Sequence, residues 1–275
     1  MNRAYVARDG TGNNLEPGTG VVPILLQGEP RVLRVVGTGC YVARYGLVLT
    51  AGHVLAELQD EKALGASYVC HLAANDTVHF RQLLSVSWLI DRDLGIAQVD
   101  NYLERFPDNP LMNHRVRLST RRPEIGEPLV TYAYPENLPL DFNRPENARE
   151  IRADMYPGRV LEHIGPRKRP YLPYPHIETS IEILGGASGG PVFDEEGSVI
   201  GVASRGWDFR GATDDESSLS SVVLIDDLLR LRLQLLAVPP ASFEGQQLPA
   251  EQPEGGWTFR QLAELGHVIL NRDRD

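Results

Sequence analysis

The stretch ILGGASGGPVF, residues 183–193, crowds four glycines around a single serine, Ser188. Glycine loses more conformational freedom on folding than any other residue, and it has no side chain to pack. So many glycines in one short stretch indicate a turn whose backbone something must approach very closely. The sequence therefore raises two questions: what approaches this turn, and whether Ser188 reacts with it.

Strand-like runs, rich in β-branched and aromatic residues and punctuated by Gly, Asp and Asn, lie on both sides of this turn. They form two groups, separated by a Pro/Asn/Arg-rich connection near residues 106–126. The DEEG of residues 194–197 predicts a hairpin directly after the turn. Because helices do not alternate with the strands, a parallel α/β sheet is not expected. We predict an all-β fold of two six-stranded antiparallel barrels, at about residues 20–110 and 125–224.

Helical patterns occur only late in the chain. Apolar residues at positions 225, 228, 229, 233 and 236, with acidic residues in the first turn, predict a helix over residues 225–237. Residues 1–238 would then form the main domain. Residues 239–275 are predicted to be a linker, by their composition, followed by a short C-terminal helical tail with Thr258 as N-cap.

Composition narrows the class of protein. The 275 residues suit one large domain or two tightly joined halves, and a net charge of −10 without a basic stripe argues against a nucleic-acid partner. The short basic segment at 166–170 is interpreted as a solvated loop. No apolar run is long enough to span a membrane and no secretory signal is visible, so we expect no membrane association and a cytoplasmic location. Cys40 and Cys70 are expected to be free thiols, and no motif predicts a metal, nucleotide or other cofactor.

One interpretation of Ser188 is a nucleophile elbow, because GASGG satisfies the G-x-S-x-G pattern of esterases with a parallel sheet. On that interpretation its partners follow it in the chain: His267 with Asp208, Asp214 or Asp215. The context disagrees, since an elbow needs a helix directly after the serine, and here Gly-Gly-Pro and a hairpin follow. A structural turn with a bystander serine also stays open from this stretch alone.

The other interpretation is a turn that aims backbone N–H groups at a substrate carbonyl. The N–H groups of Gly186 and Ser188, two residues apart, could converge on one oxygen as negative charge develops there. A serine of this kind needs a histidine and an aspartate upstream, in the order His, Asp, Ser. His53 follows an apolar strand in LVLTAGHVL, and Asp93 begins one in DRDLGIAQV, with Asp91 as the alternative carboxylate.

Taken together, these three segments resemble the motifs of trypsin-like serine proteases with the chymotrypsin fold, of the bacterial type. The segments are GTGCYVARYGLVLTAGHV at 37–54, DLGIA at 93–97 and ETSIEILGGASGGPVFDEEGSVIGVASRG at 178–206. The resemblance runs in order over roughly residues 25–237. It implies a serine endopeptidase that acts on protein or peptide substrates through an acyl-enzyme intermediate.

The resemblance also implies a role for each matching residue. Ser188 would be the nucleophile, His53 the general base and Asp93 the group that orients the imidazole. The N–H groups of Gly186 and Ser188 would form the oxyanion hole.

In the substrate site, Ser204 and Gly206 would belong to the edge segment that pairs with the substrate backbone. Glu182, six residues before the serine, would line the floor of the specificity pocket and favour a basic residue before the cleaved bond, or else point to solvent. A preference for glutamate is not expected, because Ala203 stands where Glu-specific relatives place a histidine.

The chain also departs from the family pattern at several positions. Ala187 replaces the aspartate that pairs with a freshly cleaved N-terminus in animal digestive members, and Val54 replaces a disulfide cysteine. Arg205 replaces a frequent aromatic residue. Activation by N-terminal processing is therefore not expected, and gating by a regulatory protein partner or by the tail is a hypothesis. The alternative function is a protease fold that is catalytically idle or latent and serves as a binding module.

Overall fold

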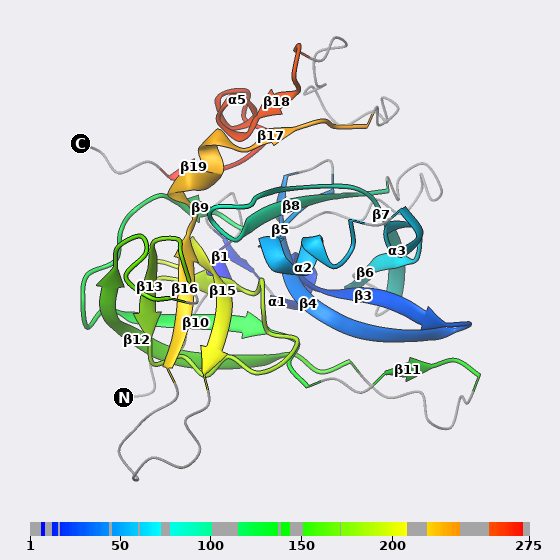
Figure 1. Ribbon diagram of the computed structural model, residues 1–275, viewed down its shortest axis with the longest axis horizontal. Coiled ribbons are helices and arrows are strands. Elements are labelled where there is room, and N and C mark those ends of the chain that lie inside the picture. Colours follow the sequence, from blue (N-terminus) through cyan, green and yellow to red (C-terminus); the bar gives the residue numbers. More distant parts are fainter. Residues whose placement is uncertain are drawn as a thin grey trace.

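Two closed six-stranded antiparallel β-barrels make up the body of the molecule, as the sequence predicted (Figure 1). The computed structural model describes residues 7–8, 13–15, 17–43, 46–59, 61–72, 78–100, 115–136, 139–143, 151–170, 172–207, 219–236 and 253–271. In Figure 1 the first barrel is blue to teal and the second green to yellow, and the orange and red C-terminal segment lies above them.

The first barrel closes in the order β4-β3-β6-β7-β8-β5, with β5 pairing back onto β4. Its strands are β3 (Val21–Glu29), β4 (Val32–Ala43), β5 (Leu47–Ala51), β6 (Ser67–Leu72), β7 (Val78–Leu89) and β8 (Leu94–Val99), and the short β11 (Leu140–Asp141) is added to the edge of β4. Between them lie two short helices, α2 (Gly52–Ala56) and α3 (Glu61–Gly65).

The second barrel closes in the order β14-β10-β12-β13-β16-β15, with β14 pairing onto β15. Its strands are β10 (Pro128–Ala133), β12 (Asp154–Ile164), β13 (His176–Thr179), β14 (Pro191–Phe193), β15 (Val199–Trp207) and β16 (Leu219–Leu224). The hairpin predicted after the glycine-rich turn is confirmed, because β14 and β15 pair antiparallel on either side of residues 194–198. A strand rather than a helix thus follows Ser188, which excludes the nucleophile elbow.

Strand β8 is buried along its whole length because both of its faces are covered. Leu94 and Ile96 belong to the apolar cluster shared with the second barrel, whereas Ala97 and Val99 belong to the interior of the first barrel. This alternation is the two-residue period of a strand. Consequently β8 runs along the seam between the barrels, and a residue next to its first residue, Leu94, can contact both barrels.

The helix predicted over residues 225–237 is wrong in type and length. The chain forms a six-residue 3₁₀ helix, η2 (Ile225–Arg230), and then a short strand, β17 (Arg232–Leu233). Leu231 already has extended dihedral angles, and Leu228, Leu231 and Leu233 are all buried in the cluster between the barrels. The buried side chains therefore differ in part from the predicted set, because Leu231 is buried and Leu236 is exposed.

The C-terminal segment packs onto the body of the protein. It contains β18 (Trp257–Thr258), α5 (Phe259–Glu264) and β19 (Leu270–Asn271), and Thr258 forms the predicted N-cap within a capping box with Gln261. Strand β18 pairs with β17, and β19 pairs with β9 (Leu118–Ser119). The buried apolar side chains of this segment join the cluster between the barrels: Trp257, Phe259, Leu262 and Val268. His267 is buried here, while Asp208, Asp214 and Asp215 lie outside the described residues.

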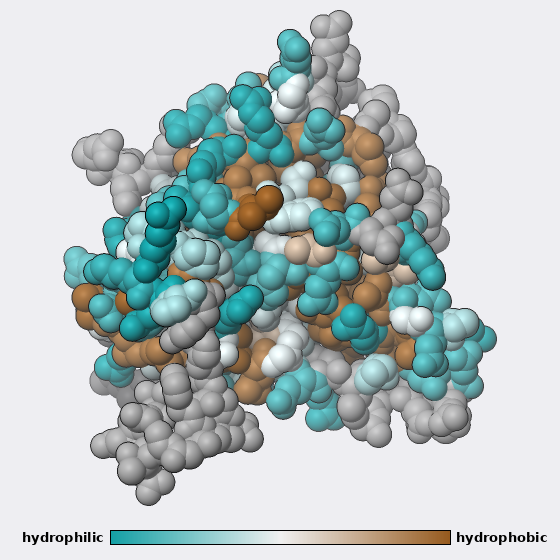
Figure 2. Space-filling model, in the orientation of Figure 1, coloured by the Kyte–Doolittle hydropathy of each residue, from teal (hydrophilic) through white to brown (hydrophobic). Residues whose placement is uncertain are grey.

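The remaining elements are short: β1 (Ala7–Arg8), β2 (Asn14–Leu15) and α1 (Pro17–Gly20). Cys40 and Cys70 are free thiols. On the face shown in Figure 2, hydrophilic residues predominate and hydrophobic ones are visible in patches between them. Within the described part of the chain, none of the helices has the length and hydrophobicity needed to cross a membrane.

Candidate active site

The ends of two paired strands bring His53 and Asp93 together. Strands β5 and β8 run antiparallel with Ala51 opposite Leu94, so the residue after one strand lies next to the residue before the other. Between them Gly52 begins α2, and a Cβ atom there would lie 3.2 Å from the Cα atom of Asp93. A small residue at position 52 is therefore needed for the close approach of the two segments.

The Asp93 carboxylate is anchored to both the backbone and the ring of His53. Oδ1 accepts hydrogen bonds from the His53 backbone N–H (2.7 Å) and from Nδ1 (3.0 Å), and Oδ2 also lies 3.0 Å from Nδ1. The backbone of Asp93 has φ = 51°, in the left-handed region, where aspartate is tolerated better than most residues. Such a conformation is costly, and it persists here where the tight turn after β7 aims the carboxylate at α2.

Asp93 is the carboxylate of the pair, and Asp91 is not. Burial raises the pKa of Asp93, but hydrogen bonding and charge from His53, with a hydrogen bond from Ser204, outweigh burial and hold the pKa below its ordinary value. Asp91 is largely exposed and pairs with Arg92 and Arg230. The stretch DRD thus divides its two carboxylates between a surface ion pair and the histidine.

The turn that carries Ser188 is fastened to the first barrel by Thr38 of β4. The Thr38 N–H donates to the Ser188 carbonyl (2.8 Å), and its Oγ1 donates to the Gly186 carbonyl (2.9 Å). Gly189 has φ = 83°, and a Cβ atom there would lie 1.9 Å from Thr50 Oγ1 and 2.3 Å from the Thr38 carbonyl oxygen. The first question raised by the sequence is answered for this position: the backbone of the other barrel approaches the turn.

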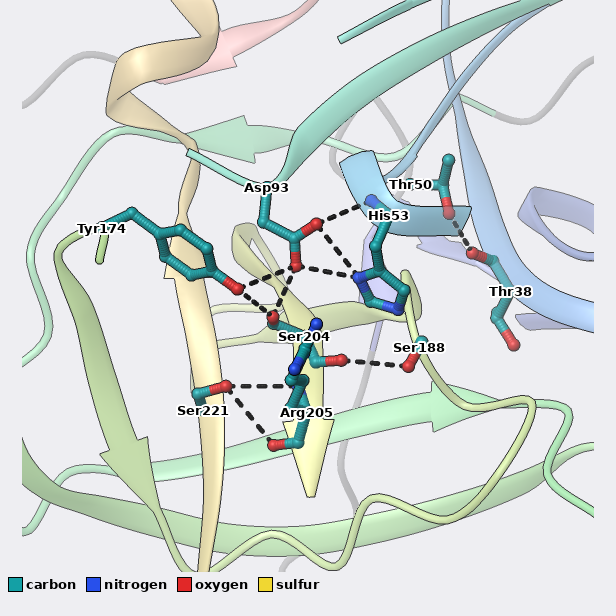
Figure 3. Close-up of polar contacts among 9 residues, drawn as sticks. All are labelled: Thr38, Thr50, His53, Asp93, Tyr174, Ser188, Ser204, Arg205 and Ser221. Atoms are coloured by element: carbon teal, nitrogen blue, oxygen red, sulfur yellow. Dashed lines mark hydrogen bonds and ion pairs between the residues drawn. The ribbon is translucent and has the colours of Figure 1, made fainter. Parts of the chain in front are cut away.

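The hydroxyl group of Ser188 donates to the backbone carbonyl of Ser204, at 2.9 Å. Figure 3 shows the His53 ring between Asp93 and Ser188, with the dashed line from Ser188 leading to β15. Among the described residues, no hydrogen bond joins Ser188 to His53. The structure therefore brings the three predicted residues to one place but leaves the serine turned toward the second barrel.

The N–H groups of Gly186 and Ser188 lie in the same turn, and in the described part of the chain no acceptor is hydrogen-bonded to either. Gly186 has φ = 88°, a left-handed conformation that favours glycine. The carbonyl of Gly185 is turned away, since it accepts from the backbone N–H of Glu136 at 2.7 Å. Two unused donors on either side of Ala187 are what an oxyanion hole requires.

The residues predicted to bind substrate differ in their burial and contacts. Ser204 is buried against Asp93 and donates to its Oδ2 at 2.5 Å, and Arg205 is exposed beside it. Gly206 packs against the irregular segment before the turn, because a Cβ atom there would lie 2.2 Å from the carbonyl oxygen of Ile183. Glu182 is exposed, so the alternative in which it points to solvent describes this conformation.

One residue that contacts Asp93 was not predicted from the sequence. Tyr174, just before β13, is buried, and its hydroxyl lies 3.3 Å from Asp93 Oδ2 and 3.1 Å from Ser204 Oγ. No periodic pattern or motif marks it, because it lies in an irregular proline-rich loop. Among the residues that the structure describes, no group of three His, Cys, Asp or Glu side chains is arranged to hold a metal ion.

Comparisons with known proteins identify the family of this chain and similar folds. Residues 37–202, more than half of the 275 residues, match the family model described as trypsin-like peptidase domain. The crystal structure of Deg5 is similar to this chain, with a TM-score of 0.53 and 22% identity, covering 76% of this chain and 85% of that one. An inactive serine-to-alanine mutant of Rv3671c from M. tuberculosis H37Rv matches with a TM-score of 0.46 and 20% identity, covering 75% and 82%. No curated protein matches significantly.

Proposed function

The chain belongs to the trypsin-like peptidase family, a family of serine endopeptidases, and on this premise we propose that it cleaves proteins with a triad of His53, Asp93 and Ser188. The observation that carries the proposal is the hydrogen bonding of His53 to a buried Asp93, at the seam where the Ser188 turn is fastened to the first barrel. The arrangement of these three residues fits acyl transfer through an acyl-enzyme intermediate.

In the proposed mechanism, Ser188 Oγ turns from the Ser204 carbonyl toward His53 and attacks the carbonyl carbon of the peptide bond. His53 accepts the hydroxyl proton and later gives it to the leaving amine. Asp93 holds the imidazole with its Nδ1 proton facing the carboxylate and stabilises the cation that forms. Water then attacks the acyl-enzyme ester, with His53 again as the base, and releases the acid product.

The developing oxyanion would be stabilised by the N–H groups of Gly186 and Ser188. Backbone donors that are already aimed need no reorganisation as the charge forms, and each is worth about 3–4 kcal/mol of transition-state stabilisation. The carbonyls of Gly185 and Ala187 share peptide planes with these two N–H groups, and they accept from the backbone N–H groups of Glu136 (2.7 Å) and Gly190 (3.0 Å), so both donors keep their direction without side-chain support. This fastening replaces the N-terminal ion pair that Ala187 cannot form.

The substrate backbone would pair with the free edge of β15 at residues 204–206. Strand β14 pairs with β15 only over Val199–Val202, while β16 covers the other edge through Trp207. An extended peptide can add to such an edge by main-chain hydrogen bonds. Its N–H groups would compete with Ser188 for the Ser204 carbonyl, so peptide binding would itself release the serine hydroxyl.

We further propose that this conformation is a resting one, which a substrate or a regulatory protein partner must open. Support comes from the Ser188–Ser204 hydrogen bond and from the contact of Gly206 with Ile183, which leaves no room for a side chain between the two segments. The same two observations also fit the alternative function, an idle protease fold that serves as a binding module. The two functions differ in whether opening restores hydrolysis.

For the residue before the cleaved bond we propose a modest preference for lysine or arginine. Glu182 is exposed, and with Glu136 and Asp154 it raises the pKa of Tyr156, after burial as the larger cause, so the three acidic groups act on one area. Exposed ion pairs contribute about 0.2–1 kcal/mol, which corresponds to a preference of roughly 1.4-fold to fivefold. A Glu182→Gln variant should lose this preference, whereas uncharged substrates should be cleaved as before.

A library of quenched fluorescent peptides tests the proposed function. We expect hydrolysis by the wild type and none by Ser188→Ala or His53→Ala, with a covalent acyl intermediate seen by mass spectrometry at low pH. Hydrolysis that persists in Ser188→Ala would contradict the proposal. Denatured proteins can be added to test whether a bound polypeptide opens the resting conformation. If peptides bind but are not hydrolysed, with or without these proteins, the binding-module function would be favoured.

A further inference from the structure

Tyr174 reaches the Asp93 carboxylate from the second barrel, on the side opposite His53 (Figure 3). The side chain is 7% exposed, and its hydroxyl lies 3.3 Å from Asp93 Oδ2. Two prolines flank it, Pro173 and Pro175, which restrict the backbone on both sides and lower the entropy cost of holding the ring in place. Asp93 is thus contacted by polar groups of both barrels.

The proton of the Tyr174 hydroxyl can be located by counting donors. Ser204 Oγ lies 2.5 Å from Asp93 Oδ2, so the single hydroxyl proton of Ser204 belongs to that bond. Tyr174 must then be the donor toward the pair, and its proton faces Ser204 Oγ at 3.1 Å and Asp93 Oδ2 at 3.3 Å. Either target has the same effect, because donation to Ser204 Oγ strengthens the Ser204 bond to the carboxylate.

The ring of Tyr174 is held by His176 at the start of β13. His176 Nδ1 lies 3.0 Å from the Tyr174 carbonyl oxygen, and the two rings meet edge to face with centroids 6.2 Å apart. His176 Nε2 is buried and has no hydrogen-bond partner among the described residues, which fits a neutral ring that donates through Nδ1. Burial, the largest cause, lowers the pKa of His176 and keeps the ring neutral.

We propose that Tyr174 is a positioning residue of the active site, which with Ser204 holds Asp93 Oδ2 and leaves the carboxylate facing His53. The proposal rests on the proposed triad and adds to it a residue from outside the three motifs. Tyr174 makes no hydrogen bond with Ser188, and it reaches β15 only through the buried side chain of Ser204, which is itself bonded to Asp93, so it acts through Asp93. Its effect should fall on the chemical step rather than on substrate binding.

The charged and titratable groups around this contact define the direction of the effect. His53 faces Asp93 from the first barrel, and Arg205 on β15 acts on Tyr174 from the second. Burial and the Asp93 charge raise the pKa of Tyr174 to about 12, so the phenol stays a donor at any working pH. Removing this donor leaves more negative charge on the carboxylate, which favours the protonated imidazole of His53.

The test compares Tyr174→Phe with Tyr41→Phe in the full chain. Tyr41 is a matched control, because it is fully buried and its hydroxyl is also hydrogen-bonded, to Arg81 within the first barrel. The measurement is the NMR titration of the His53 imidazole, assigned with His53→Ala, together with the pH profile of kcat/KM. A third protein, with 3-fluorotyrosine at position 174, keeps the ring volume and gives a stronger donor, so it remains informative if Tyr174→Phe does not fold.

We expect the His53 titration midpoint and the acid limb of activity to move up by roughly 0.3–1 pH unit in Tyr174→Phe. The fluorotyrosine protein should move them down, and Tyr41→Phe should leave them unchanged. For Tyr174→Phe, kcat should fall about threefold to tenfold with KM unchanged. An unmoved midpoint in folded Tyr174→Phe, or in the fluorotyrosine protein, would overturn the proposal. Because the titration needs no turnover, it decides on Tyr174 even if the peptide assay refutes the proposed function.

Discussion

Replacing Gly189 by alanine should separate the Ser188 turn from the first barrel and destabilise the whole protein. The added Cβ atom would lie 1.9 Å from Thr50 Oγ1, 2.3 Å from the Thr38 carbonyl oxygen and 2.8 Å from the Ala51 nitrogen. Two of these three atoms belong to the backbone, so the strain cannot be relieved by turning a side chain. The backbone also has φ = 83° at this position, which an alanine adopts only at a cost.

The expected loss can be summed from three effects. The left-handed conformation costs an alanine about 1–2 kcal/mol. Overpacking of a close contact costs about 1–3 kcal/mol. The hydrogen bond from Thr50 Oγ1 to the Thr38 carbonyl, 2.7 Å long, must also be disturbed, at about 1 kcal/mol. The total of roughly 3–6 kcal/mol is a large share of the stability of a typical domain.

Urea unfolding followed by tryptophan fluorescence measures this loss. Gly185→Ala is the matched control in the same turn, because a Cβ atom there would meet no atom within 4 Å and its φ is not positive. We expect the control to change the unfolding free energy by less than about 1 kcal/mol. A loss below about 1 kcal/mol for Gly189→Ala would refute the idea that contact with the first barrel requires this glycine.

Three further outcomes follow from the same contacts. Asp93→Asn should lower kcat by about 10⁴-fold while the fold is kept, because the amide favours the wrong tautomer of His53. Peptide hydrolysis kinetics measure this loss, and a loss of kcat under tenfold would exclude Asp93 as the orienting group. The pKa of Asp93 lies below its ordinary value of 3.8 in the folded protein, so its charge stabilises the fold above that pH, and the stabilisation is lost as the pH falls through and below it. The difference in unfolding free energy between wild type and Asp93→Asn should therefore narrow as the pH falls through 3.8 and below, whereas a constant difference over that range would contradict the shift. Ending the chain after residue 252 removes four buried apolar side chains from the cluster between the barrels, and burial of each contributes about 1.5–3 kcal/mol to stability. Calorimetry should therefore show a strongly lowered Tm or no folded protein. An unchanged Tm would contradict the packing of this segment.

The sequence was sufficient for the fold and for the meeting of His53, Asp93 and Ser188. These residues lie at the ends of strongly apolar strands or in a glycine-rich turn, where local sequence dictates backbone geometry. The apolar pattern was not sufficient at residues 225–237, where the chain changes from a 3₁₀ helix to a short strand, with Leu231 buried and Leu236 exposed. Apolar spacing alone does not determine which backbone conformation a short segment adopts.

Three features of the site were beyond the reach of the sequence. Tyr174 lies in an irregular loop, and its contact with Asp93 depends on how two barrels dock. The direction of the Glu182 side chain depends on the path of the backbone into the turn, and the orientation of Ser188 on a single side-chain torsion. Trp257 and Phe259 were recognisable as apolar, but their destination between the barrels is a property of long-range packing.

Covalent labelling of the intact protein with a fluorophosphonate tests most directly whether residue 188 is an activated nucleophile. We predict a single adduct at that serine, absent in Ser188→Ala and formed far more slowly in His53→Ala. An adduct that survives the loss of the serine, or a labelling rate that does not depend on the histidine, would contradict the account.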